Sequence, residues 1–492
     1  MKTFCSHFFR DYGMVLVLLV LVLVISGLTN KQQYPTGADA GRQVARWIVS
    51  QSSGTPQVVI VGRATAEDRQ FTEAVEQTLQ SLDAEVLGKV NGGPADVRRT
   101  LQALIDAGKT PTAIAANNVT AKWSVYDRFD GVGSEKCVIP QPYYWPDFLK
   151  VSNLLNIANQ TAIYALIAVG MTMVIITAGI DLSVGSLVAL SAVSAALTVQ
   201  ALGGKEAGGA AVAAGIAVGV LGCALAGACN GLVVIGFEAP SLLLAATLTL
   251  VVSILTRVLG GVVWWQAAAA GAAACLLYYL SRLMLKGKSL GDIRVPPFIA
   301  TLAMMMMASG LAFRMSDGQS ISDLPQAFYF LGGGQVGGVP NPVWLMVIFY
   351  VAAHIIMSRT IFGRYVYAIG GNEEAARLSG VPVKMTLLTV YTLSGALAGL
   401  GGVVLTSQLA AGDPKYGLMY ELEVIAAVVV GGASLMGGEG KIFGTLIGAF
   451  IIAVIKNGMN LTNVDPFNQK IVLGAVLLGA VLLDTIKRRA SA

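Results

Sequence analysis

Residues 151–281 carry only five charged side chains, and this scarcity of charge constrains the fold more than any other feature of the sequence. Over all 492 residues, 55% of the side chains are hydrophobic, 12% are charged, and the mean hydropathy is +0.68. A soluble domain has about twice that share of charge. Such a chain cannot cover its surface with polar groups, which excludes a soluble enzyme, a disordered protein and a nucleic-acid binder. A polytopic membrane protein remains.

Apolar segments suited to crossing a bilayer recur along the chain. The first is the apolar run at 14–28, part of an N-terminal transmembrane helix that we assign to residues 1–29. Because about 20 residues are usual for a span, this run fits either a cleaved signal sequence or an uncleaved first helix. Eleven further spans are expected, which makes about twelve transmembrane helices: 157–178, 183–201, 209–235, 241–257, 262–284, 297–314, 342–357, 385–407, 422–436, 441–459 and 470–486.

Residues 30–150 differ from the rest, since they hold 26 of the 61 charged side chains. Apolar runs at 58–61, 84–90 and 112–116 predict strands, and helical spacing of apolar residues lies between them. The order β-α-β-α-β predicts a small α/β domain inserted between the first and second spans. The segment 131–146, rich in Tyr, Trp and Pro, is expected to be an irregular return to the membrane. The fold class is thus an all-α polytopic membrane protein with an inserted small α/β domain.

Lysine and arginine in the short loops set the orientation. With the N-terminus in the cytoplasm, fourteen of these side chains fall on the inside and six on the outside. This excess predicts a multi-pass protein of the cell (inner) membrane with both termini cytoplasmic. It also predicts that residues 30–150 are extracytoplasmic.

The sequence carries no recognisable catalytic or metal-binding motif. The pattern GxxxxGK[ST] would need glycine where Arg282 stands, so the Gly287-Lys288-Ser289 segment is not a phosphate-binding loop. The two histidines lie far apart and the five cysteines are scattered. We therefore expect no enzyme activity, no catalytic residue, no metal, no cofactor and no nucleic-acid partner.

The loop between 359 and 384 carries a local helix signal. Asn372 is a suitable N-cap, and acidic residues follow it where the positive end of a helix dipole favours them. Gly380 and Pro382 end the segment. From the residues alone, it is either a solvated connector or a docking helix for a cytoplasmic partner. The candidate residues are Gly370, Gly371, Asn372, Glu373, Glu374, Ala375, Ala376, Arg377 and Gly380.

Five stretches, in order along the chain, resemble the permease subunits of ribose-type ABC importers. They are 168–172 running into Gly179-Ile180-Asp181-Leu182-Ser183-Val184-Gly185-Ser186, then 297–302, the loop 370–382, then 420–432, and 444–448. The resemblance covers roughly 151–489, with a break at about 239–295. It therefore implies a permease domain at 151–492 that carries an inserted apolar hairpin.

The resemblance implies a function and a set of partners. The chain would be the permease of an importer for a monosaccharide or similar small polar solute. A separate cytoplasmic ABC ATPase subunit would receive the 370–380 loop, an extracytoplasmic solute-binding protein would deliver the solute, and two permeases in the membrane lipid would form a homodimer. The domain at 30–150 would then either dock the solute-binding protein or capture solute, or it would serve only as a structural appendage.

Asp181 and Ser183 are candidate gating or pathway residues. An acid beside apolar spans is a functional candidate by default, but Asp181 also precedes an expected helix, where it can cap free N–H groups. Two other functions compete with the permease. One is a receptor that senses a ligand through residues 30–150. The other is an ion-coupled secondary transporter, which commonly needs titratable groups near the membrane midplane, and the spans here are nearly free of them.

Overall fold

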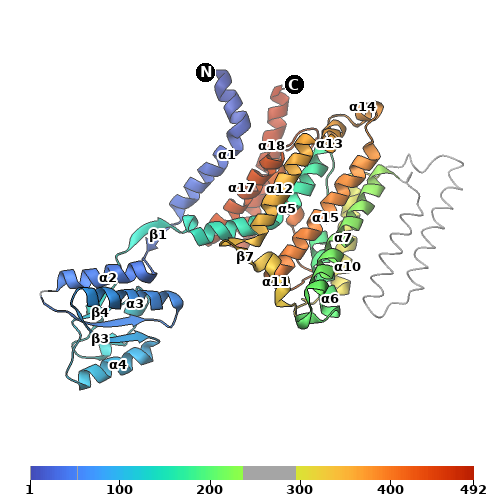
Figure 1. The fold of residues 1–492 in the computed structure, drawn as a ribbon. Coiled ribbons are helices and arrows are strands. Elements are labelled where there is room, and N and C mark those ends of the chain that lie inside the picture. The colour runs from blue at the N-terminus through green and yellow to red at the C-terminus, as the bar shows by residue number, and fades with distance from the viewer. Residues whose placement is uncertain (1, 53, 237–294, 492) are drawn as a thin grey trace. The chain divides into compact units, whose positions relative to one another are not determined.

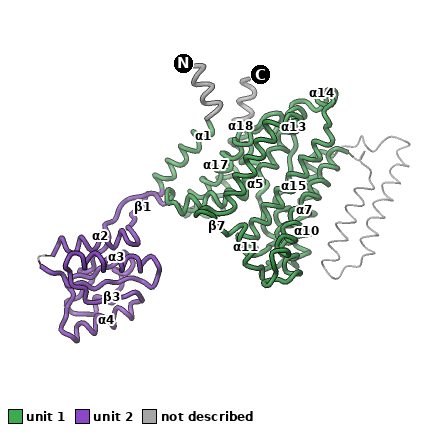
Figure 2. The backbone as a smooth tube through the Cα atoms, viewed as in Figure 1, with its two compact units in different colours: residues 1–28, 148–492 green, residues 29–147 purple. Residues whose placement is uncertain are grey.

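The computed structural model describes residues 2–52, 54–236 and 295–491, with side chains described between 13 and 482 of these ranges (Figure 1). Two compact units result (Figure 2). We call residues 1–28 with 148–492 the helical unit, and residues 29–147 the α/β unit. The expected spans at 241–257 and 262–284, and nearly all of the hairpin expected at 239–295, lie outside the described residues.

The α/β unit is built on a four-stranded parallel sheet with the strand order β3-β2-β4-β5. Its strands are β2 (Gln57–Gly62), β3 (Glu85–Asn91), β4 (Ala113–Ala115) and β5 (Cys137–Val138). Its helices are α2 (Gly37–Gln51), α3 (Ala66–Ser81) and α4 (Pro94–Asp106). A separate antiparallel pair, β1 (Asn30–Gln33) with β6 (Tyr143–Pro146), joins the two ends of the unit.

The central strand β2 is buried on both faces, so its side chains alternate between two cores. Val58 and Ile60 pack with α2 and α3, whereas Val59 and Val61 pack with α4 and the segment around Tyr126. The three strands expected from sequence lie within one residue of β2, β3 and β4. The segment 131–146, expected to be irregular, contains β5 and β6, because such short strands leave almost no periodicity to detect.

The helical unit contains seven described helices that are long and apolar enough to cross a membrane. They are α5 (Val151–Ile176), α6 (Val184–Ala201), α7 (Gly209–Ile235), α10 (Pro297–Met315), α12 (Asn341–Arg359), α15 (Val383–Leu409) and α17 (Ile442–Leu461). Each matches an expected span. Two more helices, α1 (Lys2–Leu28) and α18 (Pro466–Ser491), have shorter apolar stretches. The total of twelve spans stays a prediction.

Short elements complete the unit. They are α11 (Gln326–Gly333), β7 (Gln335–Val336), β8 (Val339–Pro340), α13 (Ile361–Gly371), α14 (Glu373–Leu378) and α16 (Tyr420–Val430). The eleven residues of α16 extend about 16 Å, roughly half of a bilayer core. The span expected at 422–436 therefore ends early, because the chain turns at Gly431 and at Gly432, which has a φ of +89°.

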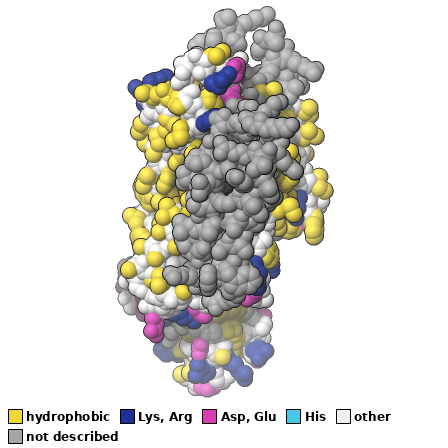
Figure 3. Space-filling model, turned by 90° about the vertical axis from the view of Figure 1, so that its right-hand side faces the viewer, with side chains coloured by type: hydrophobic (Ala, Val, Ile, Leu, Met, Phe, Trp, Pro, Cys, Tyr) yellow, Lys and Arg dark blue, Asp and Glu magenta, His cyan; other side chains and the backbone are white. Residues whose placement is uncertain are grey.

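Apolar side chains cover much of the outer surface of the helical unit (Figure 3). Leu221 of α7, Met306 of α10 and Ile348 of α12 are each at least 60% exposed. An exposed apolar belt of this kind suits contact with lipid. α1 packs against α17, with Ile25 beside Gly458. The uncleaved first helix stays a prediction.

Contacts between helices define two ends of the helical unit. Ile25 of α1 and Val454 of α17 pack against Ile157 of α5. At the far end of α5, the carbonyl of Ile176 accepts a hydrogen bond from the Gly438 N–H (2.8 Å). The 26 residues of α5 extend about 39 Å at 1.5 Å per residue. The Ile25 end and the Ile176 end are thus separated by about a membrane thickness.

Candidate functional site

Helix α14 forms where the sequence predicts a capped helix. The side-chain oxygen of Asn372 accepts the Ala375 N–H at 2.9 Å. Arg377 in the last turn forms an ion pair with Glu374 in the first turn, with 2.5 Å between Nη2 and Oε1. Gly380 takes a φ of +83°, where a side chain would be strained, and its N–H donates to the Arg377 carbonyl at 3.1 Å. Local chemistry therefore determines both ends of α14.

One side of α14 is held against the helical unit and the other is open. Ala376 is buried and packs in a cluster with Ile235 of α7 and Leu387 of α15. Leu378, by contrast, is 77% exposed, and α14 lies at an edge of the helical unit (Figure 1). The helix α14 is thus seated on α7 and α15 through Ala376 and leaves Leu378 open to solvent.

Gly370 of α13 lies against backbone rather than side chains. A Cβ added there would stand 1.7 Å from the Ile176 carbonyl oxygen and 2.5 Å from the Gly438 nitrogen. Tyr367, one turn earlier, donates its hydroxyl to the Gly440 carbonyl at 2.7 Å. The last turn of α13, which leads into α14, is therefore packed directly on the loop between α16 and α17.

Helix α16 is packed just as closely on α17. A Cβ on Gly448 would stand 2.0 Å from the Ala427 carbonyl oxygen. Because neither contact leaves space for a side chain, α13, the α16–α17 loop and α16 form one continuous backbone contact.

A partly buried ion pair lies near the first turn of α16. Lys456 of α17 contacts both carboxylate oxygens of Glu423 at 2.9 and 3.0 Å. The same ammonium group lies 3.3 Å from the hydroxyl of Tyr164 and 5.0 Å from the centre of its ring. The pair thus ties α5, α16 and α17 together halfway along the bundle.

Asp181 is completely buried between α5 and α6. One carboxylate oxygen accepts the N–H of Ser183 at 3.0 Å and the Ser183 hydroxyl at 2.6 Å. The other accepts the hydroxyl of Ser394 of α15 at 2.9 Å, and Asn230 of α7 donates to the Ser183 hydroxyl at 3.0 Å. The hydrogen bond to the Ser183 N–H resembles a cap, but the remaining bonds clamp three separate helices together.

The chain around Asp181 is non-helical backbone inside the helical unit. Irregular backbone at membrane depth is tolerated where protein buries it or where it lines a water-filled cavity. Beyond this segment, Gly185 in the first turn of α6 lies against Glu421 in the first turn of α16, since an added Cβ would be 2.3 Å from the Glu421 Oε2. Two helices thus begin side by side within the bundle.

The two sets of candidate residues connect through the segment between α5 and α6. A Cβ added to Gly437 would stand 2.8 Å from the Cβ of Ala178, and the Gly438 N–H donates a hydrogen bond to the Ile176 carbonyl. Sequence reasoning missed Asn230, Ser394 and Lys456 as members of these clusters. Asn230 and Lys456 are polar residues in otherwise apolar spans, which is a usable signal, but a serine in a helix such as Ser394 gives none.

Comparison with known proteins gives the family of the chain. A family model described as the permease component of branched-chain amino acid transport systems matches residues 153–267 and 258–481. The ribose import permease of Escherichia coli K12 is 39% identical over 351 residues, covering 70% of this chain and 88% of the relative. The chain belongs to this permease family. The match to the family model begins at residue 153, just after the α/β unit.

Further relatives agree with this permease assignment. The ribose import permease of Bacillus subtilis 168 is 40% identical over 344 residues, covering 70% of this chain and 87% of the relative. The L-arabinose transport system permease of Escherichia coli K12 is 41% identical over 206 residues, covering 42% and 63%. No solved structure matches the chain. The relatives are permease subunits, which implies no catalytic activity for the permease itself.

Proposed function

We propose that this protein is the membrane-spanning subunit of an ATP-driven importer for a monosaccharide. The observation that carries the proposal is the 39% to 41% identity with permeases named for ribose and L-arabinose. Membership of the family implies a separate ATPase and a solute-binding protein as partners. Two copies of the chain, surrounded by lipid, would enclose the path. The same relatives favour the permease over a receptor or an ion-coupled transporter.

The contacts of the helical unit support one orientation. If α14 meets the ATPase, the Ile176 end is cytoplasmic, because Gly370 packs on Ile176. The α/β unit leaves the helical unit at residue 28 and rejoins it at 148, both at the Ile25 end, and would be an inserted extracytoplasmic domain. The helices α1 and α18 each have their other terminus toward the Ile176 end, which would make both chain termini cytoplasmic. The excess of Lys and Arg on the inside agrees with this orientation.

The coupling segment would comprise the residues predicted from sequence. Glu374 and Arg377 form an exposed ion pair along α14, Ala376 seats the helix, and Leu378 would offer an apolar contact to a groove on the ATPase. ATP-driven closure of the ATPase would displace α14, and the continuous contact through Gly370 would carry that displacement to α16. The ATPase would thereby shift the permease between two states of access.

Asp181 and Ser183 would act as a gate within this movement. Their hydrogen bonds join α7 and α15 to the chain between α5 and α6, whose start at Ile176 touches the coupling loop at Gly438. A rearrangement of the loop would therefore strain or release this clamp. Such a role differs from simple capping because it requires Ser394 and Asn230, which lie on other helices.

Co-purification and transport together test the proposal. The tagged protein is purified in a mild detergent with its native partners, and ATP-dependent sugar uptake is measured in cells. Leu378→Asp should abolish recovery of the ATPase and reduce uptake to background. Leu418→Asp is the matched control, because Leu418 is 78% exposed but lies just before α16. Its substitution should leave ATPase recovery unchanged.

Two results would contradict the proposal. Equal ATPase recovery with Leu378→Asp and Leu418→Asp would show that α14 is not the docking element. Sugar uptake that persists without any ATPase would refute the importer itself.

A further inference from the structure

The strand order of the α/β unit marks a place where ligands commonly bind. The chain runs from β2 to β3 on one side and then crosses to β4 on the other, and open parallel sheets bind ligands at the carboxyl ends of strands where the order reverses. Here that place is filled. Asp68 is 3% exposed, and its Oδ2 accepts from Arg63 Nε at 2.8 Å and from Asn117 Nδ2 at 2.9 Å.

The charge state of Asp68 is consistent with a structural role. Burial acts to raise the pKa of this carboxyl, but the hydrogen bonds from Arg63 and Asn117 outweigh it and hold the pKa below its ordinary value. The acid is therefore ionised and fully engaged within the unit. The Asp68 network therefore occupies the carboxyl ends of β2 and β4.

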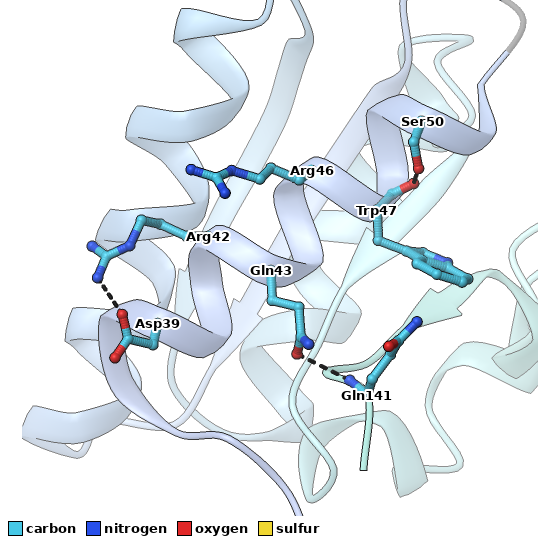
Figure 4. A pocket seen from close by; sticks show the side chains of 7 residues that line it. All are labelled: Asp39, Arg42, Gln43, Arg46, Trp47, Ser50 and Gln141. Atoms are coloured by element: carbon cyan, nitrogen blue, oxygen red, sulfur yellow. Dashed lines mark hydrogen bonds and ion pairs between the residues drawn. The ribbon is translucent and has the colours of Figure 1, made fainter. Parts of the chain in front are cut away.

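An open hollow lies on the outer face of α2. Its volume is about 450 Å³, within the range of sites for small molecules. Six of the seven lining residues come from α2, whose opposite face is buried on the sheet through residues such as Val44 and Ile48. The lining residues, drawn in Figure 4, are Asp39, Arg42, Gln43, Arg46, Trp47, Ser50 and Gln141.

The arrangement of these side chains suits a hydroxylated ring. Trp47 is 43% exposed, so one face of its indole can stack on the C–H face of a sugar. The Gln43 side-chain oxygen accepts the Gln141 backbone N–H at 3.1 Å, which joins the segment between β5 and β6 to α2. The ring of Trp47 and the side chain of Gln141 lie beside each other (Figure 4).

The net charge of the hollow is small and positive. Asp39 and Arg42 form an ion pair within it, which leaves Arg46 as the main source of net charge. Amide, guanidinium and hydroxyl groups together offer both donors and acceptors, as the hydroxyl groups of a sugar require. An open site of this kind encloses little of a ligand and gives weak binding.

We propose that the α2 hollow is a low-affinity monosaccharide site, with Trp47 as the stacking platform and Arg46, Gln43 and Gln141 as hydrogen-bonding groups. The choice of a sugar as ligand rests on the proposed function. The site would hold solute on the inserted domain, apart from the path through the membrane.

Saturation-transfer NMR on the full-length protein in lipid nanodiscs tests the site. The probes are D-ribose, L-arabinose and D-glucose. We expect transfer to the ring C–H protons of at least one of them, reduced at least fivefold by Trp47→Ala and by Arg46→Gln. Trp145→Ala is the matched control, because Trp145 belongs to the same unit and is 46% exposed but does not line the hollow. It should leave the signal unchanged, and the thermal unfolding of all three variants should match that of the parent.

Some outcomes would overturn the inference. A signal that Trp47→Ala leaves unchanged would come from another site and would refute the inference. The inference would also be refuted if none of the three sugars showed more saturation transfer with the protein than with empty nanodiscs. Uptake measured in cells separates this inference from the proposed function. Normal ATP-dependent sugar uptake without binding at the hollow would refute only the inference, whereas binding at the hollow without any sugar uptake would refute only the proposed function.

Discussion

The close packing of α7 on α15 makes a stability prediction with an internal control. A Cβ added to Gly227 of α7 would stand 2.2 Å from the Tyr391 carbonyl oxygen of α15. A Cβ added to Gly222, in the same helix, would meet nothing within 4 Å among the residues that the structure describes. Small residues allow such close approach of helices in lipid. Gly227→Ala should therefore destabilise the protein and Gly222→Ala should not.

The geometry sets the size of the effect. Cβ atoms essentially never approach another heavy atom within 3.0 Å, so α7 and α15 would have to separate locally by about 1 Å. Overpacking of this kind typically costs about 1–3 kcal/mol. Both substitutions gain the same helix propensity, about 1 kcal/mol for Gly→Ala, and this gain cancels in the comparison. Gly227→Ala should thus be less stable than Gly222→Ala by about 1–3 kcal/mol.

Reversible unfolding in mixed micelles, by titration with a denaturing detergent, measures this difference. The free energies of unfolding are compared between the two variants and the parent protein. If Gly227→Ala and Gly222→Ala agree within about 0.5 kcal/mol, the ordinary scatter of neutral substitutions, then α7 and α15 do not pack as closely as described. If Gly222→Ala lowered the free energy of unfolding and Gly227→Ala did not, the open surroundings described for Gly222 would be wrong.

Three further predictions follow from other contacts. Gly370→Val should lower sugar uptake at least about tenfold, a loss of coupling within the usual range, while the ATPase still co-purifies with the protein. If the variant lost the ATPase as well as uptake, this prediction would be wrong. Lys456→Met leaves Glu423 unpaired at a partly buried site and should cost about 1–3 kcal/mol of stability, an amount discounted for solvent screening, whereas the double variant with Glu423→Gln should recover most of it. In the α/β unit, Asp68 has its pKa held below 3.8 because hydrogen bonds outweigh burial. The stability it contributes is present above about pH 4 and is lost as the pH falls through the folded-state value. The protection factors of the β2 amides, which are hydrogen-exchange rates corrected for the intrinsic effect of pH, should therefore fall between pH 5 and pH 3 in the parent and change less in Asp68→Asn.

Several features could be predicted from sequence because they depend on neighbouring residues. The scarcity of charge in 151–281 indicates membrane helices, since any other backbone would leave polar groups unsatisfied in lipid. The helix α14 follows from Asn372 and Gly380, each acting within one turn of the chain. Strand β2 follows from a short apolar run closed by glycine.

Other features required the tertiary structure. The sequence from 422 to 436 reads as one span, but α16 ends at Val430, and the Gly431 that follows packs against Gly444 of α17. The partners of Asp181 come from α7 and α15, and Ser394 lies 213 positions away along the chain. Periodicity and capping act over a few residues, so they give the elements and their ends. Which buried polar groups meet is decided by how the helices pack, because each must find its hydrogen-bond partner wherever the fold brings one within reach.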